Sequence, residues 1–315
     1  MNTVEFLRLS SEIVPDRTAI IFEDKRIDFL TLQQRVNKLA DSLSKLGVVA
    51  GDRVSTIQVN CNEHIEAYFA ITSLDAIYVP VNFRVKDDEL EVMLTDSKPK
   101  AIFAGSRYHE LVKQATKNNS DVKLFISMDD ESEGWINYDD LIRDGESEDR
   151  FPEYDDDDTN IIMYTSGTTG APKGVMLKHD SFSSYILANV MPADPDEEEK
   201  NILTVPLHHI AGMQAVISAI YGGRTLVIQR QFEPHDWMRL VQEERINRAM
   251  MVPTMLKAIL DHEEFQNFDI SSLGVITYGA APMPASVIKD AITKLPGTRF
   301  INAFGQTETA STITM

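Results

Sequence analysis

The chain has 315 residues, of which 43% are hydrophobic and 25% charged, and a formal net charge of −19. At about 150 residues per domain, this length predicts two domains or one large one and excludes a disulfide-stapled miniprotein. The acidic charge repels nucleic-acid phosphates and anionic lipid surfaces, so we expect no nucleic-acid partner and no membrane-surface role. The single cysteine, Cys61, allows no intramolecular disulfide and no cysteine-based metal site, and we therefore expect the cytoplasm.

The N-terminal residues lack a basic start followed by an apolar run, so no secretory signal is predicted. Further along, helical and strand patterns alternate. A helix is predicted over 31–47, because its apolar residues recur at spacings of three and four before Gly47. The other elements expected in this half are strands at 54–59, 77–81 and 100–105 and helices over 65–74 and 90–94. This alternation predicts the α/β class, with a largely parallel sheet covered by helices on both faces.

The segment 129–158 is acidic and poor in apolar periodicity, which indicates a solvated linker. The alternative is a metal-binding carboxylate cluster, although its acids lack the spacing of a calcium loop. A second acidic patch at 194–200 marks a later boundary. We expect an N-terminal segment over 1–50 that packs with the second subdomain, a first α/β subdomain over 51–195 and a second one over 196–315.

The second half resumes the alternation and predicts a second sheet of the same type. Its expected strands are 202–207, 224–229, 248–253, 273–280 and 299–305, and its expected helices are 213–221, 234–244, one through Leu260 and one from Pro284. The stretch 206–221 is apolar but too short and too polar at its start to span a bilayer, so no membrane span is expected. Ligand sites in open α/β sheets lie beyond the carboxyl ends of strands, so the loops there are the candidates for chemistry.

The densest such loop is MYTSGTTGAPKGVM, over 163–176. Its glycines allow a backbone that turns close to a ligand, its four hydroxyls add hydrogen-bond donors, and Lys173 adds a positive charge. This combination predicts a polyphosphate site. It is not a Walker A loop, because no Gly-Lys-Ser/Thr follows at the required spacing. The alternative is a glycine-rich surface turn with no ligand.

Here the sequence resembles the AMP-forming adenylating enzymes, which include acyl-CoA synthetases, luciferases and the adenylation domains of peptide synthetases. The stretch 165–174 reads almost letter for letter as their signature loop. Three further stretches match in the right order: PLHHIAGM at 206–213, TYGAAPMP at 277–284 and NAFGQTETA at 302–310, where Phe304 replaces the usual tyrosine. The resemblance implies the fold of that family's large N-terminal domain, which is two stacked, mostly parallel sheets.

The resemblance also implies roles for individual residues. The ATP β- and γ-phosphates would be held by Thr165, Ser166, Gly167, Thr168, Thr169, Gly170 and Lys173. The adenine turn would be Gly279, Ala280, Ala281 and Pro282, and the following nucleotide-binding motif would be Asn302, Ala303, Phe304, Gly305, Gln306 and Thr307. Thr307 would contact the α-phosphate, Glu308 would bind Mg²⁺, and His209 would stand at the mouth of the carboxylate pocket. For His209, a ring satisfied within a helix start is the alternative, and His208 beside it leaves open which ring faces the site.

Members of this family continue past the Thr-Glu motif into further nucleotide contacts, the rest of a barrel and a small C-terminal domain. Met315 follows Glu308 closely. We therefore expect a truncated piece of a longer enzyme, which is weakly active or inactive alone. Loss of those parts would expose apolar surface and favour self-association into a homo-oligomer.

The implied reaction joins a carboxylic acid to ATP, giving acyl-AMP and pyrophosphate, after which the thiol of CoA displaces AMP. A fatty or aryl acid is expected, because 210–220, 249–256 and 279–281 supply apolar material for a pocket. No aspartate that would hold an amino-acid ammonium is identified, which favours an acyl-CoA synthetase. Two alternatives stay open: an amino-acid-adenylating domain, and a non-catalytic fragment that binds a nucleotide or an acyl-adenylate.

Overall fold

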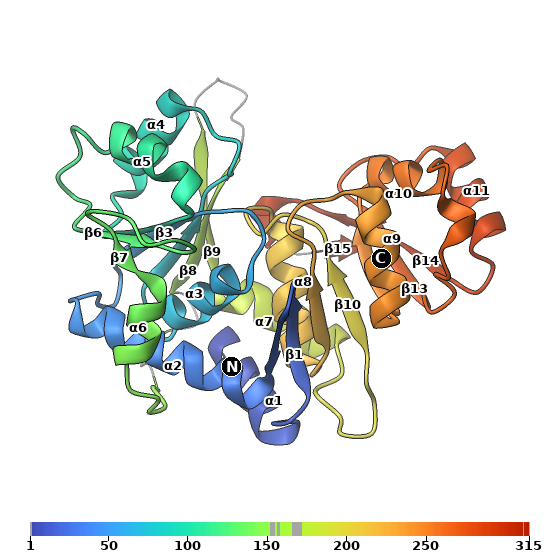
Figure 1. The fold of residues 1–315 in the computed structure, drawn as a ribbon, viewed down its shortest axis with the longest axis horizontal. Helices are drawn as coiled ribbons and strands as arrows, with labels where there is room; N and C mark the ends of the chain where they lie inside the picture. Colours follow the sequence, from blue (N-terminus) through green and yellow to red (C-terminus); the bar gives the residue numbers. More distant parts are fainter. Residues whose placement is uncertain (1, 152–154, 156–157, 166–171, 311, 315) are drawn as a thin grey trace. The chain divides into compact units, whose positions relative to one another are not determined.

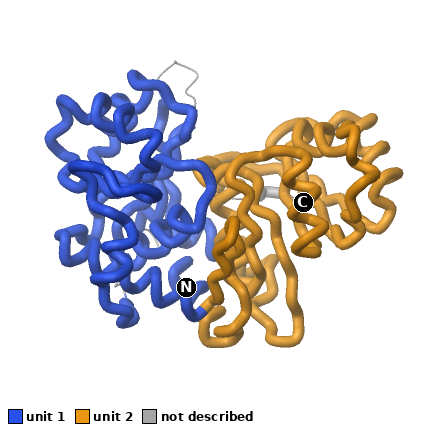
Figure 2. The backbone as a smooth tube through the Cα atoms, in the orientation of Figure 1, with its two compact units in different colours: residues 1–8, 30–183 blue, residues 9–29, 184–315 orange. Residues whose placement is uncertain are grey.

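The computed structural model describes residues 2–151, 155, 158–165, 172–310 and 312–314. The chain divides into two compact units, coloured separately in Figure 2. Unit 1 comprises 1–8 and 30–183, and unit 2 comprises 9–29 and 184–315. Helices α1 (Thr3–Ile13) and α7 (His179–Asn189) each contain one of the points at which the chain passes from one unit to the other.

The sheet of unit 1 has seven strands among the described residues, in the order β7-β6-β5-β3-β4-β8-β9. The strands are β3 (Arg53–Ile57), β4 (Ile77–Pro80), β5 (Ala101–Ala104), β6 (Leu124–Ser127), β7 (Ile136–Asn137), β8 (Thr159–Thr165) and β9 (Lys173–Lys178). All neighbours pair in parallel except β8 and β9, which form an antiparallel hairpin. Thr165 at the carboxyl end of β8 is paired with Lys173 at the start of β9.

Helices cover both faces of this sheet. They are α2 (Phe29–Lys45), α3 (Asn62–Thr72), α4 (Asp87–Ser97), α5 (His109–Ala115) and α6 (Tyr138–Asp144), with a 3-10 turn η1 (Ser106–Tyr108) before α5. Apolar residues of α4 and α5 pack in one core with Ile102 and Ala104, and Figure 1 shows these two helices together. Phe103 lies between those two residues in β5 and contacts Tyr138 of α6, because alternate strand residues face opposite sides.

The sheet of unit 2 has eight strands in the described chain, ordered β15-β14-β13-β12-β10-β11-β1-β2. They are β1 (Thr18–Phe22), β2 (Lys25–Asp28), β10 (Lys200–Leu203), β11 (Thr225–Ile228), β12 (Arg248–Met251), β13 (Val275–Gly279), β14 (Arg299–Gly305) and β15 (Thr312–Thr314). In this sheet order, the six strands from β14 to β1 pair in parallel with their neighbours. The edge strands β2 and β15 each pair antiparallel with the strand beside them.

One large core holds unit 2 together. The helices of unit 2 are α8 (Ile210–Tyr221), α9 (Pro234–Glu244), α10 (Pro253–Leu260) and α11 (Ala285–Lys294), with 3-10 turns η2 (Phe265–Asn267) and η3 (Thr307–Thr309). Side chains of α9, α10 and α11 pack against β10, β11 and β12, with Trp237 and Met238 at 1% and 0% exposure. Figure 1 shows these three helices gathered beside the strands.

The expected alternation of strands and helices is confirmed, and so is the mostly parallel α/β architecture. The linker prediction for 129–158 is wrong in its middle, where β7 joins the sheet and α6 packs with Tyr138, Leu141 and Ile142 buried. The structural division also differs from the expected boundaries. Residues 30–50 group with unit 1, whereas 9–29 group with unit 2, because β1 pairs with β11.

In the part of the chain that the structure describes, no helix is both long enough and apolar enough to cross a membrane.

Candidate functional site

A cavity opens in unit 2 at the carboxyl ends of neighbouring parallel strands. It is lined by Ile210, Ala211, Gln214, Met250, Ala280, Ala303 and Gly305, and it holds about 450 Å³ of empty volume, part of it open to solvent. These residues come from the first turns of α8 and from β12, from β14 and from the residue after β13. The apolar segments that the sequence suggested for an acyl pocket therefore meet in one place. Gln214 is a lining residue that sequence reasoning did not single out, although a polar residue within this apolar helix was a signal.

The end of β13 is shaped by a close approach to β14. A Cβ atom on Gly279 would lie 2.3 Å from the carbonyl oxygen of Ala303, which no real side chain tolerates. The next residue, Ala280, has φ 64°, in the left-handed region that L-residues rarely adopt. Such local strain concentrates at ligand sites, and here it turns the chain into the cavity at the predicted adenine segment. Ala281 and Pro282 continue as exposed residues.

The nucleotide-binding motif predicted over 302–307 begins within β14 and presents side chains to solvent. Phe304 is 54% exposed, which is unusual for a phenylalanine and leaves a ring face available for stacking on a base. Asn302, Gly305 and Gln306 are also exposed, whereas Ala303 is buried.

Thr307, the last residue of this motif, and Glu308 lie in η3, which follows β14 after Gln306. Thr307 is half-buried and Glu308 is exposed. No ion pair joins Glu308 to a described residue. Its oxygens are therefore available to a cation, and Mg²⁺ commonly takes one protein carboxylate together with phosphate oxygens. No group of three or more acidic, histidine or cysteine side chains among the described residues could hold a metal by itself.

The turn before α8 distinguishes the two histidines. His208 is buried at 7% exposure, whereas His209 is exposed and caps α8 with its backbone. Their ring centroids are 4.2 Å apart. Although His209 is accessible, the protein atoms around it desolvate the ring and lower its pKa, which favours a neutral imidazole. Gly212 fixes this turn, because a Cβ there would lie 2.4 Å from the carbonyl oxygen of Pro206.

In unit 1, the predicted phosphate loop leaves β8. Thr165 and Lys173 are the last residue pair of the β8–β9 ladder, next to the segment that connects the two strands. Lys173 is exposed, and no ion pair with a described residue neutralises it. Ser166, Gly167, Thr168, Thr169 and Gly170 lie outside the described residues.

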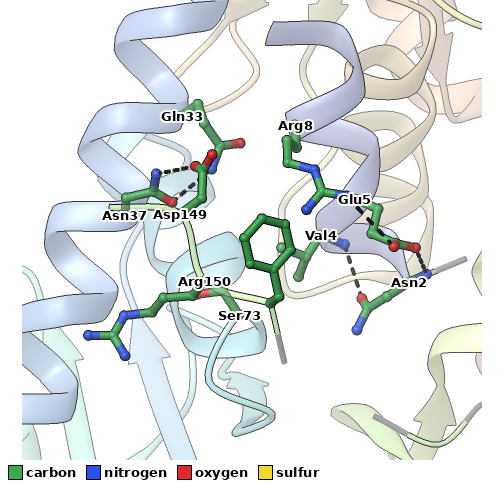
Figure 3. A pocket seen from close by; sticks show the side chains of 10 residues that line it. Asn2, Val4, Glu5, Arg8, Gln33, Asn37, Ser73, Asp149 and Arg150 are labelled. Carbon is green, nitrogen blue, oxygen red and sulfur yellow. Dashed lines mark hydrogen bonds and ion pairs between the residues drawn. The ribbon is translucent and has the colours of Figure 1, made fainter. Parts of the chain in front are cut away.

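A second cavity, shown in Figure 3, lies wholly within unit 1 and includes none of the predicted site residues. A chain of hydrogen bonds runs along one side of it: Gln33 Nε2 donates to Asn37 Oδ1 (2.8 Å), and Asn37 Nδ2 donates to Asp149 Oδ1 (2.7 Å). On the opposite side, the Arg8 guanidinium lies 4.7 Å from the ring centroid of Phe151. These contacts join the acidic segment to α1 and α2, and they describe a structural junction rather than a reaction centre.

Comparisons with known proteins agree with these motifs. The indoleacetate–CoA ligase of Aromatoleum aromaticum is 28% identical over 311 residues, which cover 98% of this chain and 60% of that protein. The long-chain-fatty-acid–CoA ligase FadD13 of Mycobacterium tuberculosis is 30% identical over 269 residues, which cover 84% of this chain and 52% of that protein. The chain thus spans between half and two thirds of the length of these curated relatives.

Solved structures show the same fold. The inhibitor-bound N-terminal domain of FACL13 from Mycobacterium tuberculosis superposes with a TM-score of 0.87 at 27% identity, covering 98% of this chain and 77% of that one. The AMP-binding enzyme family matches residues 8–315, nearly the whole sequence. The chain therefore belongs to the AMP-binding enzyme family.

Proposed function

We propose that this chain is the part of an AMP-forming acid–CoA ligase that binds ATP and the carboxylic acid. The observation that carries the proposal is the cavity at the carboxyl ends of β12, β13 and β14, which is lined by residues of three family motifs, over 206–213, 277–284 and 302–310, together with Gln214 and Met250. The relatives named above are both CoA ligases, one for an aryl acid and one for fatty acids. A fatty or aryl acid is the proposed substrate class, and CoA is the proposed acceptor.

In the first step, a carboxylate oxygen of the acid attacks the α-phosphorus of ATP. The new O–P bond gives acyl-AMP, and the bond to the β-phosphate breaks and releases pyrophosphate. The protein needs to hold the two reactants in line and to stabilise the developing charge, with little covalent work of its own. In the second step, the thiol of CoA takes the acyl group, and AMP leaves.

We assign the residues as follows. The backbone of 279–282 and the ring of Phe304 bind adenine, the hydroxyl of Thr307 donates to an α-phosphate oxygen, and His209 orients the acid. Thr165 and Lys173, with the loop between them, bind the β- and γ-phosphates. Glu308 would hold Mg²⁺, which supplies charge stabilisation at the phosphates when bound. Ala211 and Met250 form part of the wall that receives the body of the acid.

The test is carboxylate-dependent exchange of labelled pyrophosphate into ATP, over a panel of short, long and aromatic acids. We expect exchange with one class of acid. Replacing Lys173 with Ala should reduce it about 10-fold or more by removing a charge beside the phosphates. Lys178→Ala is the matched control, because it removes the same charge from the other end of β9 and should leave exchange unchanged.

If Lys173→Ala and Lys178→Ala behave alike, the assignment of the phosphate loop is wrong. If no acid supports exchange while ATP still binds, as measured by calorimetry, this chain is a nucleotide-binding module without the first half-reaction.

A further inference from the structure

Gln214 is chemically unlike the other residues that line the cavity of unit 2. The other six described residues that line it are Ile210, Met250, three alanines and one glycine. An amide therefore stands in a wall that is otherwise apolar. It carries two hydrogen-bond donors and an acceptor with two lone pairs.

The position of Gln214 on α8 directs it to the cavity. Ala211 lies one turn earlier on the same helix face and also lines the cavity, as expected for residues three apart. Met213, Val216 and Ile217 are buried at 1%, 0% and 0% exposure and anchor the other side of the helix in the core. Gln214 is only half-buried, and the small side chain of Ala211 leaves room for a ligand to approach it.

The side-chain amide of Gln214 makes no hydrogen bond to any residue in the described ranges. Its hydrogen-bond partners in the cavity are therefore water or a ligand. A ligand with a purely hydrocarbon body would displace that water without offering a hydrogen bond in its place, which leaves the amide unsatisfied. A ligand with a hydroxyl or carbonyl oxygen at this depth would replace the lost hydrogen bond. Sites built to hydrogen-bond a substrate group discriminate strongly against analogues that lack the group.

We propose that Gln214 is a specificity-determining residue, which selects carboxylic acids bearing a hydroxyl or carbonyl oxygen on an otherwise apolar body over acids whose body is hydrocarbon alone. This inference rests on the proposed function, because it takes the cavity as the place that receives the body of the acid. It narrows the class of substrate from any fatty or aryl acid to one with a polar substituent remote from the carboxylate.

The test compares phenylpropanoate with its three ring-hydroxylated analogues, each titrated into the chain with and without ATP and Mg²⁺ and followed by ligand-observed NMR. In the wild-type chain, at least one hydroxylated acid should bind about 10-fold more tightly than phenylpropanoate, which is the effect of one lost hydrogen bond in a pocket. In Gln214→Leu, which keeps the side-chain volume and suits this apolar helix, that ratio should fall to about 2 or less. Gln214→Ala provides a second variant with the same expectation if the leucine variant misfolds.

Gln114→Leu is the matched control, because Gln114 is an exposed glutamine on α5 of unit 1 and its loss should leave the ratio unchanged. The proposal is overturned if no hydroxylated acid binds more tightly than phenylpropanoate, if the Gln214 variants keep the wild-type ratio, or if none of the acids binds under either condition. Pyrophosphate exchange with the same acids separates the two proposals. Exchange with an unchanged ratio in the variants defeats only the role of Gln214, whereas selective binding without exchange defeats only the proposed activity of the chain.

Discussion

Gly279 has a crowded environment and Gly297 has an open one. Comparing substitutions at these two glycines therefore tests how closely β13 and β14 are packed. A methyl group on Gly279 would collide with the Ala303 carbonyl at 2.3 Å, whereas one on Gly297 would meet nothing within 4 Å. We expect Gly279→Ala to lower the free energy of unfolding by about 1–3 kcal/mol through overpacking, and to reduce ATP-dependent exchange by shifting the turn at Ala280.

Urea unfolding of Gly279→Ala beside Gly297→Ala measures this difference, and Gly297→Ala should change stability little. Equal stabilities would mean that the two strands separate easily at this point, and that the close approach does not constrain the turn.

His64 is a buried histidine, and folding disfavours its protonated form. Its Nε2 and the Thr56 hydroxyl are 2.7 Å apart, and burial lowers its pKa from 6.5 to about 3. Between these two pKa values, His64 is protonated in the unfolded chain but neutral in the folded chain. The free energy of unfolding therefore falls as the pH falls. One such group contributes a slope approaching about 1.4 kcal/mol per pH unit.

His64→Gln keeps a polar partner for Thr56 but does not titrate. Its free energy of unfolding should therefore decline less steeply than that of the wild-type chain between pH 6 and pH 4, when the difference at pH 8 is taken as the reference. Parallel declines in denaturant titrations would show that His64 is protonated in the folded state.

At the scale of elements, three helices of unit 1 meet at one buried carboxylate. Glu66 of α3 has a fully buried side chain, and burial raises its pKa despite the Arg35 charge nearby. Arg35 Nε of α2 lies 3.0 Å from it, the Tyr138 hydroxyl of α6 donates to it at 2.7 Å, and Asn62 Nδ2 donates at 2.8 Å. This junction explains why α6 is part of the fold although its segment is acidic.

Arg35→Met would leave Glu66 buried without its counter-charge, and we expect a loss of about 3 kcal/mol in the free energy of unfolding near pH 8. The loss should shrink toward pH 5, because Glu66 then takes up a proton in the folded state. Arg143→Met is the control, since Arg143 pairs with Asp140 on the exposed surface of α6, where an ion pair contributes little, so its loss should change stability much less than the loss of Arg35. Chemical denaturation at both pH values measures these effects, and a pH-independent loss would contradict the role of the carboxylate.

At the scale of the whole molecule, charge repulsion is the dominant long-range electrostatic effect. The 49 acidic residues outnumber the 30 basic ones, so exposed acidic groups remain in excess after every possible ion pair. Such an excess weakens the compact state, and salt screens it. Surface ion pairs would respond in the opposite direction, but each contributes only about 0–1 kcal/mol.

We therefore expect the melting temperature to rise by about 2 °C or more when NaCl increases from roughly 10 to 150 mM. Calorimetry at the two salt concentrations measures the shift, with an uncharged osmolyte as the control for non-ionic effects. A fall in melting temperature would show that ion-pair networks, such as the one around Glu199 between Arg224 and Arg248, outweigh the net charge.

The sequence alone determined the order of the central strands and helices, the α/β class and the family motifs at the ends of strands. It could do so because these signals are local: apolar periodicity, glycines at tight turns and a dense group of hydroxyls beside Lys173. The tertiary structure decided which distant segments meet. It places α6 against Glu66, groups 9–29 with unit 2, buries His208 while exposing His209, and brings Gln214 into one cavity with Met250 and Gly305. None of these outcomes follows from local periodicity, because each depends on the free energy of contacts between residues far apart in the chain.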